Sequence, residues 1–438
     1  MKKAWTANRI AGTIALAAVV ALAGLWAAST LTPRAASAAP PNPHLSAGTT
    51  TDTCAACHRI HTAQENNLNK AAVPQSTLCF SCHDGTGANY DVAAEFLDAT
   101  VPANDPATSS FYSHPATTPS NHTSAQVDEF AGVLNRHSEC SDCHNPHLAG
   151  PAAPAETANG WTASGALTGT TGVAASTPLA WVNWITYEYE LCLRCHSSYT
   201  QLLSYSKESY KETDKAAEFN PANNSYHPVE APGKNATTEM ATSLAGGSLW
   251  QFTTASTIRC ANCHGNYRLV GNPPTLNSPA PQVRLAPHSS PYRGLLIANY
   301  RDRGLKPANE AYNSNDFALC FLCHSPAPFS DSSETARSDT NYRYHGKHLG
   351  GIGNAGAGGL DIDTAGEGQG NAICAECHYR LHGTAFAPWA DNQNYSRGVN
   401  FAPDVQPLPG QTSPLWSGPT SRTCSLICHG KNHDAKSY

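Results

Sequence analysis

The sequence predicts a chain that is mostly irregular coil with short α-helices and little β-structure. Three observations carry this prediction. The 438 residues include 33 glycines and 31 prolines, and long amphipathic runs are absent. In addition, all sixteen cysteines fall into pairs that are followed at once by a histidine. We therefore expect a fold that is organised around the groups bound at these sites, in place of one large aliphatic core.

The N-terminal segment has the pattern of an export signal. Lys2, Lys3 and Arg9 precede an uncharged stretch over residues 10–33, and a small-residue cleavage site follows at Ala36-Ser37-Ala38. We predict a Sec signal peptide over residues 1–38, and the alternative is an uncleaved membrane anchor. No second apolar run and no cysteine for a lipid anchor follow, so we expect a secreted protein without a membrane span in the mature chain. The expected location is extracellular or at the cell surface, with the periplasm as the alternative.

Charge argues against nucleic acid as a partner. The signal segment holds four basic residues and no acidic one, so its removal takes the formal net charge from −6 to −10. Nucleic-acid binding would require clustered lysine and arginine instead.

Seven of the cysteine pairs read C-x-x-C-H, and the eighth has one extra residue between its cysteines. The pairs with their histidines are Cys54/Cys57/His58, Cys79/Cys82/His83, Cys140/Cys143/His144, Cys192/Cys195/His196, Cys260/Cys263/His264, Cys320/Cys323/His324, Cys374/Cys377/His378 and Cys424/Cys428/His429. C-x-x-C-H is the attachment site of haem c, where two thiols add to the porphyrin vinyl groups and the histidine becomes the proximal iron ligand. The sequence therefore predicts eight haem c groups.

Other uses of paired cysteines explain the pattern less well. A single C-x-x-C could be a redox pair or half of a zinc site. Neither these sites nor a disulfide framework would require a histidine after each of eight pairs.

The motifs form a loose serial repeat, which divides the mature chain into three segments with one continuous series of haems. Residues 39–150 carry sites one to three, residues 151–300 carry sites four and five, and residues 301–438 carry sites six to eight. The best helix candidates are residues 186–205, residues 206–219 and short segments around each motif. Low-complexity stretches at 151–178, 271–291, 350–370 and 393–419 are expected to be surface loops, with domain linkers as the alternative.

Twelve further histidines are candidates for the eight distal positions. We expect nine of them to be distal ligands: His61, His114, His137, His147, His227, His288, His348, His382 and His433. His345 and His348 are expected to supply one ligand between them, and His44 and His122 are the expected spares. Nine candidates for eight positions mean that one of them is wrong or serves an iron outside this chain. Since Met240 is the single methionine of the mature chain, bis-histidine haems of low potential are expected throughout.

The segment Cys54-Ala-Ala-Cys57-His58-Arg-Ile-His61 resembles the start of the extracellular multihaem cytochromes that polymerise into conducting filaments. The Ser-Tyr-His227-Pro loop and Cys143-His144-Asn-Pro-His147 are also similar to elements of that family and of related outer-surface cytochromes. The resemblance implies a homopolymer with haem stacking between subunits, in which His61 ligates a haem of the adjoining subunit.

Two functions of different kinds remain open from the sequence. The first is long-range extracellular electron transfer by a polymeric chain of haems, with a periplasmic electron shuttle as a variant that differs only in its partners. The second is an octahaem oxidoreductase that acts on a nitrogen or sulfur compound, which would need one iron with an open distal position. No motif carries the lysine that often marks such an iron, so we expect an electron-transfer protein without a catalytic residue.

Overall fold

Short helices and small hairpins make up the regular structure of the protein, which was analysed in a computed structural model. The structure describes residues 44, 54–64, 68–88, 90–97, 112–117, 138–200, 206–207, 210–211, 213–267, 285–302, 304–305, 312–330, 340–349, 372–386, 389 and 395–438. The chain divides into two units, Met1–Thr50 and Thr51–Tyr438, and every element below belongs to the second unit. The predicted signal peptide lies outside the described residues, and the division of the mature chain into three segments stays a prediction.

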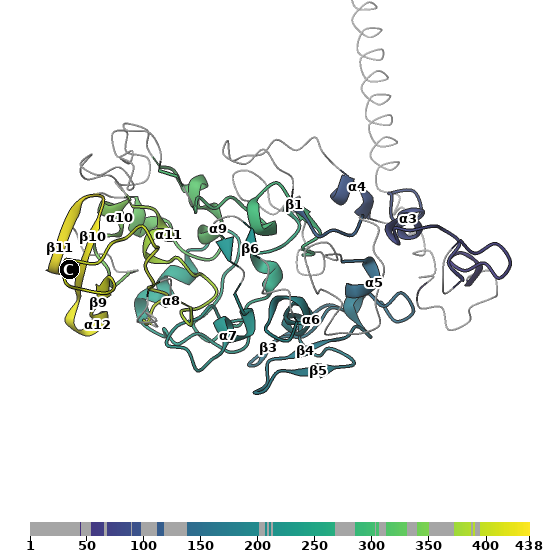
Figure 1. Ribbon diagram of the computed structural model, residues 1–438, viewed down its shortest axis with the longest axis horizontal. Helices are drawn as coiled ribbons and strands as arrows, with labels where there is room; N and C mark the ends of the chain where they lie inside the picture. Colours follow the sequence, from purple (N-terminus) through teal and green to yellow (C-terminus); the bar gives the residue numbers. More distant parts are fainter. Residues whose placement is uncertain are drawn as a thin grey trace, which may run out of the picture. The chain divides into compact units, whose positions relative to one another are not determined.

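The regular elements are all short (Figure 1). The α-helices are α3 (Ser76–Phe80), α4 (Val92–Leu97), α5 (Cys140–Cys143), α6 (Glu188–His196), α7 (Lys215–Phe219), α8 (Thr238–Ala245), α9 (Ala318–Phe321), α10 (His345–His348), α11 (Cys374–Cys377) and α12 (Gly418–Ser421). The 3-10 helices are η3 (Gly165–Leu167), η5 (Cys260–Asn262), η8 (Arg293–Leu295), η9 (Ser314–Phe317) and η10 (Ala327–Phe329). Among the described residues, no helix has the length and apolar character that crossing a membrane requires.

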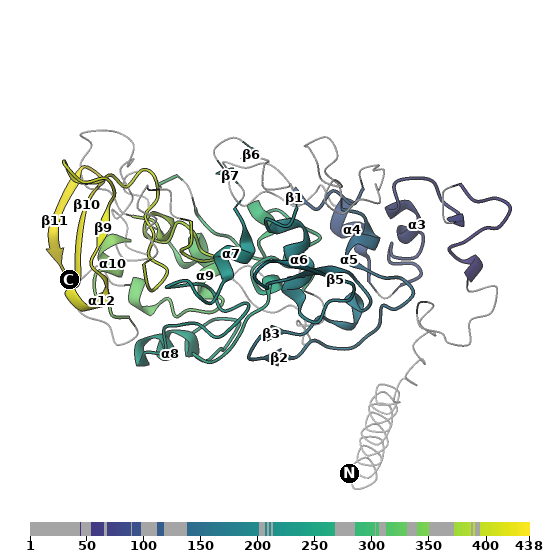
Figure 2. The ribbon, with the colours of Figure 1, turned by 60° about the horizontal axis from the view of Figure 1, so that its bottom comes forward.

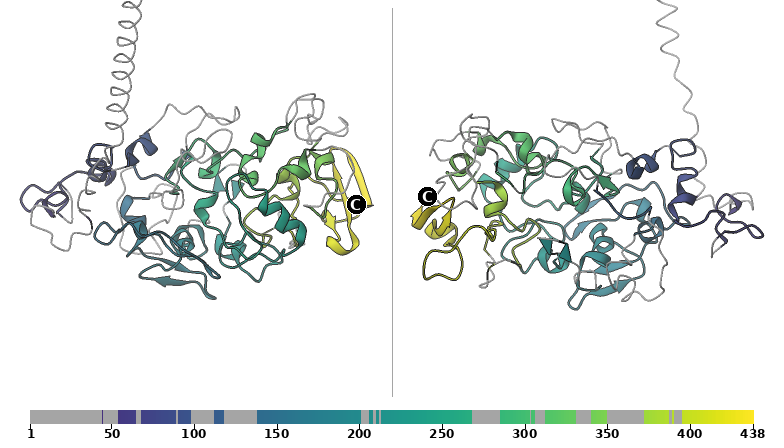
Figure 3. Two further views of the ribbon diagram at one scale, coloured as in Figure 1. Left: turned by 180° about the vertical axis from the view of Figure 1, so that it is seen from behind. Right: turned by 45° about the horizontal axis from the view of Figure 1, so that its top comes forward.

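The strands pair as small antiparallel sheets. They are β1 (Tyr112–Ser113), β2 (Glu156–Thr157), β3 (Gly160–Trp161), β4 (Gly172–Ala174), β5 (Ala180–Val182), β6 (Ser206–Lys207), β7 (Tyr210–Lys211), β8 (Ser289–Ser290), β9 (Leu415–Trp416), β10 (Thr423–Cys428) and β11 (Lys431–Ser437). Two-stranded sheets join β1 to β8, β2 to β3, β4 to β5 and β6 to β7, and a three-stranded sheet has the order β11-β10-β9. The strands of this last sheet are the yellow arrows beside the C-terminus in Figure 3. The prediction of a mostly irregular fold with short helices and little β-structure is confirmed.

Three local expectations need correction, and one of them is the surface loop expected over residues 393–419, where Phe401, Val405 and Trp416 are buried in one apolar cluster. The helix expected over residues 206–219 is wrong in its first half, where β6 and β7 form a hairpin. The helical part begins at Lys215, because the Asp214 carboxylate accepts hydrogen bonds from the amides of Ala216 and Ala217 and so caps α7. Residues 151–178, expected to be a surface loop, contain β2, β3, η3 and β4 instead. Val173 on β4 is fully buried in a cluster with Leu193 of α6. Figure 2 shows β5, the partner strand of β4, beside α6.

Among the described residues, four small apolar clusters take the place of a single core, and each packs against motif cysteines. One cluster, built around Val173 and Leu193, contacts Cys260. The other three lie between neighbouring motifs and contact, in turn, Cys263 with Cys323, Cys320 with Cys374, and Cys377 with Cys424 and Cys428. The apolar side chains of these clusters are therefore gathered at the cysteines of the fifth to eighth motifs, as expected for a fold organised around groups bound there.

Candidate haem sites

The first seven motifs each fold into one helical turn. In six of them the amide of the motif histidine donates to the carbonyl of the first cysteine at 2.9 or 3.0 Å, namely in His58, His83, His144, His264, His324 and His378. The fourth motif forms the last turn of α6. Because residues three and four apart share a helix face, each turn presents its two thiols and its imidazole together.

Two of the predicted attachment cysteines, Cys54 and Cys82, differ from the rest because they are exposed to solvent. The other cysteines are partly buried. The four apolar clusters of the described residues contact cysteines of the fifth to eighth motifs and none of the first two, so they do not cover these two thiols. The backbone of Cys82 is nevertheless fixed, since its carbonyl accepts the amides of Gly87 at 3.2 Å and Ala88 at 2.7 Å. Cys54 and Cys82 therefore differ from the other motif cysteines in their exposure, and their attachment role stays a prediction.

Side chains inside several motifs stabilise these turns. The residue just before the second cysteine accepts a hydrogen bond from the amide of the residue before the first cysteine. The donor–acceptor pairs are Glu139 to Asp142 at 2.7 Å, Arg259 to Asn262 at 2.8 Å and Ile373 to Glu376 at 3.3 Å. Each contact satisfies an amide that the start of a helical turn leaves without a partner in the turn.

Buried ion pairs connect consecutive motifs. Arg194 of the fourth motif lies 3.0 Å from Asp142 of the third, and each side chain is only 9% exposed. Glu188, at the start of α6, pairs with Arg259 just ahead of the fifth motif and also accepts the amide of Ala261 at 3.1 Å. Such contacts fix the position of one motif relative to the next.

The cysteines themselves give the spatial order of the motifs. Hydrogen bonds join Cys79 to Cys140, Cys192 to Cys260, and Cys320 to Cys374, and in each pair the contact raises the pKa of the donor thiol. In the other pairs of consecutive motifs, two thiols lie close together without a hydrogen bond between them. These thiols are Cys57 and Cys79, Cys143 and Cys195, Cys263 and Cys320, and Cys377 and Cys424. The eight motifs thus follow one another in space in the order of the chain, and all sixteen cysteines are thiols, without a disulfide.

Histidine rings from distant parts of the sequence meet in pairs. The ring centres of motif histidines and predicted distal histidines lie 6.1 Å apart in His58 and His147, 6.2 Å in His144 and His288, and 5.9 Å in His264 and His382. An imidazole nitrogen binds a transition metal at about 2 Å and the ring centre lies roughly 1 Å beyond it, so two rings on opposite sides of one metal have centres about 6 Å apart. These three pairs therefore have the separation that bis-histidine ligation of one iron requires.

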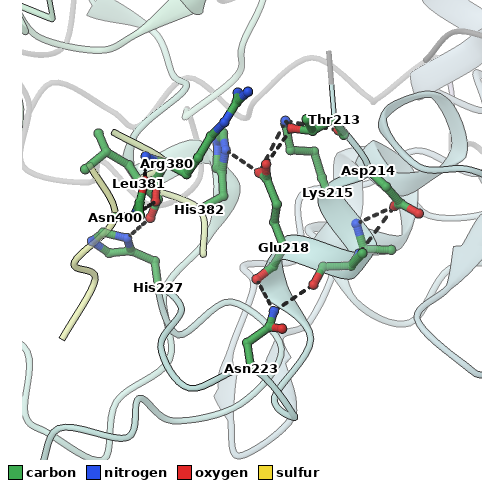
Figure 4. Close-up of polar contacts among 12 residues, drawn as sticks. Thr213, Asp214, Lys215, Glu218, Asn223, His227, Arg380, Leu381, His382 and Asn400 are labelled. Atoms are coloured by element: carbon green, nitrogen blue, oxygen red, sulfur yellow. Dashed lines mark hydrogen bonds and ion pairs between the residues drawn. The ribbon is translucent and has the colours of Figure 1, made fainter. Parts of the chain in front are cut away.

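The tautomers of these histidines are set by acceptors at Nδ1. Carbonyl oxygens lie 2.6–3.0 Å from Nδ1 of motif histidines His144, His264 and His378. A carboxylate takes this place at two predicted distal ligands, where Glu95 lies 2.6 Å from His288 and Glu218 lies 3.0 Å from His382 (Figure 4). A proton held on Nδ1 places the lone pair on Nε2, which is the atom that would bind iron.

Burial keeps several of these imidazoles neutral. Burial, with a smaller contribution from neighbouring histidines, lowers the pKa of His264 and of His324 to about 4 and that of His345 to about 3. A positive charge on His227 would lower the pKa of His324, and a positive charge on His378 would lower that of His345. The two side chains of each pair therefore also lie close together. A neutral imidazole is the form that coordinates a metal.

The remaining predicted ligands lie in different settings. His227 Nδ1 faces the Leu381 carbonyl, and the His114 ring faces the Pro287 carbonyl at 2.6 Å (Figure 4). His61 is exposed to solvent. His137 and the expected spare His122 lie outside the described residues. The ligand role of each stays a prediction.

His345 is a candidate that the sequence reasoning missed. It was expected to share one ligand position with its neighbour His348, yet both are partly buried and each Nδ1 has its own polar contact, the Thr340 hydroxyl for His345 and the Tyr344 carbonyl for His348. The spacing of the two histidines, three residues apart on a helix, permits both to point inward and could have indicated two ligands.

The eighth motif differs from the others. Cys424 and Cys428 lie on strand β10, and His429 occupies a tight turn between β10 and β11. Its Nε2 lies 3.2 Å from the Glu376 carboxylate, and both side chains are almost fully buried, at 4% and 3% exposed.

Residues 47–88, which contain the first two motifs, match the protein family described as the doubled CXXCH motif. No curated protein and no solved structure matches the chain. The thiol pairs on single turns, the Nδ1 acceptors and the ring separations fit haem c with two axial histidines. Together with the family match, they indicate that the chain is a multihaem c-type cytochrome, which binds haem covalently and transfers electrons.

Proposed function

We propose that this protein is an octahaem cytochrome that carries electrons over long distances outside the cell, as a homopolymer with a continuous series of haems. It is proposed to be secreted and to act without a catalytic iron. Each bound haem would accept an electron when its iron is reduced and donate it when its iron is oxidised.

The spatial order of the motifs is the observation that carries this proposal. Each step from the first motif to the eighth brings cysteines of consecutive motifs close together, and haems attached to them would be close neighbours. In an enzyme, one iron would need a distal position without a strong ligand. The histidines paired with His58, His144 and His264 instead lie where two imidazoles would be available for each of three irons.

The start of the second unit supports the homopolymer. His61 is exposed, and its neighbour Ile60 is the most exposed large apolar side chain described, at 78%. His58 already faces His147, so His61 is not needed for the first iron. We propose that His61 ligates an iron of the adjoining subunit, as the resemblance to filament-forming cytochromes implies.

Electron cryo-microscopy of the protein sheared from cells, identified by haem-stained gels, tests this proposal. The expected result is filaments with haems crossing each subunit boundary and His61 on an iron of the next subunit. The His61→Ala variant is expected to give separate particles that keep their in-chain histidine pairs. His44→Ala, which changes an expected spare, is the matched control and is expected to leave filaments intact. Separate particles of the unaltered protein with a five-coordinate haem would favour the oxidoreductase instead.

A further inference from the structure

The hairpin of β10 and β11 places a histidine other than His429 beside the eighth cysteine pair. Cys424, Leu426 and Cys428 alternate along β10, and although the pairing with β11 shifts register between Cys424 and Leu426, all three side chains pack in the same apolar cluster and so lie on one side of the strand. His433 on β11 is directly opposite Leu426, and directly opposed residues of an antiparallel pair project on the same face. The imidazole that lies between the two cysteines on their own face is therefore that of His433.

His429 lies in a different position because of the turn. Cys428 pairs with Lys431, which leaves His429 and Gly430 as a two-residue turn with φ values of 51° and 67°. Positive φ at both positions is the geometry of a type I′ hairpin, in which the strands continue directly into the turn. The helical turn that brings the histidine back to its cysteines in six other motifs, with its amide on the first cysteine carbonyl, does not form at this strand.

The contacts of His429 also differ from those of the other motif histidines. Its Nε2 faces Glu376, while its buried Nδ1 has no hydrogen-bond partner. Glu376 already accepts the Ile373 amide at the start of α11, so it joins the seventh motif to this turn. His429 therefore has the contacts of a buried structural histidine, with the nitrogen that would bind iron turned to a carboxylate.

His433 has the contacts of an axial ligand. Its Nδ1 lies 3.2 Å from the Lys431 carbonyl, and its ring centre lies 6.3 Å from that of His348. His348 Nδ1 in turn lies 2.9 Å from the Tyr344 carbonyl, and the Tyr342 hydroxyl lies 3.3 Å from its Nε2, at the long end of the range for a hydrogen bond. The separation of the two rings matches those of His58/His147, His144/His288 and His264/His382. Of these four pairs, this is the one that contains no motif histidine.

We propose that the iron of the eighth haem is ligated by His433 and His348, and that His429 is a structural residue held by Glu376. The motif with the extra residue between Cys424 and Cys428 would then be an attachment site on a strand, β10. Its proximal histidine would be His433, from the neighbouring strand β11. This inference rests on the proposed haem at the eighth motif.

Two methionine variants of the haem-loaded protein test the ligand assignment. Replacement of an axial histidine by methionine converts a bis-histidine haem into a His/Met haem of higher reduction potential. His433→Met is therefore expected to move one haem to higher potential in a redox titration and to change one low-spin signal in the electron paramagnetic resonance spectrum. His429→Met is expected to leave the potentials of all haems in their original range. The reverse pattern would overturn the assignment.

Haem number is measured separately, by intact mass. If the unaltered protein and both methionine variants each carry eight haems, any difference between their redox titrations reflects a change of ligand and not the loss of a haem. Seven haems in the unaltered protein, with Cys424 and Cys428 unmodified, would overturn this inference and the octahaem proposal, while leaving electron transfer through the other seven sites in place. If His429→Met fails to accumulate, His429→Gln retains a donor toward Glu376 and is expected to keep every haem six-coordinate, whereas a new high-spin haem in that variant would contradict the assignment.

Discussion

At the scale of single residues, His382 has a fully buried carboxylate, Glu218, as its Nδ1 acceptor. Glu218 is fully buried, and burial alone would raise its pKa, but contacts with His382 and Lys215 lower that pKa to about 2. A carboxylate that accepts from Nδ1 increases the basicity of the imidazole, and so favours the oxidised iron that the imidazole binds. The haem ligated by His264 and His382 should therefore have a lower potential than haems with carbonyl acceptors.

The Glu218→Gln variant tests this effect. A hydrogen bond to a neutral acceptor is weaker than one to a charged acceptor by about 1 kcal/mol, which is ~40 mV for a one-electron couple. We expect the potential of one haem to rise by about that amount in a spectroelectrochemical titration. Asp214→Asn is the matched control, because it removes a charge from the start of the same helix but can still cap α7 and does not contact a histidine. An equal shift in both variants would indicate a general effect of charge.

The motifs that are proposed to attach haem can be recognised in the sequence, whereas the pairing of histidines could not be predicted from it. Attachment depends on a local pattern of two thiols and an imidazole, which is complete within five residues. Pairing depends on which loops meet, and His147, His288 and His382 come from regions far from the motif histidines that they face. The second ligand candidate on α10, His345, was missed because sequence adjacency was taken to mean a shared position.

At the scale of elements, the motif turns are held by side chains that serve two turns at once. Asp142 caps α5 and also pairs with Arg194 on α6. The capping role could have been read from the sequence, since an acidic residue three positions after the start of a turn is a known signal. The ion pair with Arg194 depends on how α5 and α6 pack, so it could not have been predicted from the sequence. The hairpin of β6 and β7, found where a helix was expected, shows the same limit of local patterns.

The Arg194→Met variant tests the importance of the ion pair between the third and fourth motifs. Removing the arginine leaves the buried Asp142 carboxylate without its counter-charge, which typically costs 3–5 kcal/mol in the free energy of unfolding, so we expect a loss of about 4 kcal/mol. Arg293→Met is the matched control. Its ion pair with Asp302 is 3.7 Å long and 38% exposed on both sides, and a pair of this kind is worth about 1 kcal/mol or less. Denaturant unfolding of the haem-loaded proteins, followed by circular dichroism, compares the two. Equal losses would show that the buried pair does not hold the motifs together.

At the scale of the whole molecule, the number of histidines decides whether every iron can be six-coordinate. The structure brings motif histidines into contact with distal candidates from other segments. It also gives His324 and His378 close histidine neighbours, in His227 and His345. An electron carrier needs no vacant iron position, whereas reduction of a small nitrogen or sulfur compound needs one.

Carbon monoxide binding distinguishes these two states of the molecule, because it requires an open or weakly held position on reduced iron. We expect the reduced protein to show no change in its haem absorption bands when carbon monoxide is added. His382→Ala, which removes one imidazole from the pair with His264, is the positive control and is expected to let one haem bind the gas. Binding to about one haem in eight of the unaltered protein would identify an open iron and favour the oxidoreductase. An unaltered spectrum, with a responsive His382→Ala variant, would mean that the histidines of the assembled protein close every iron position, as a continuous electron path requires.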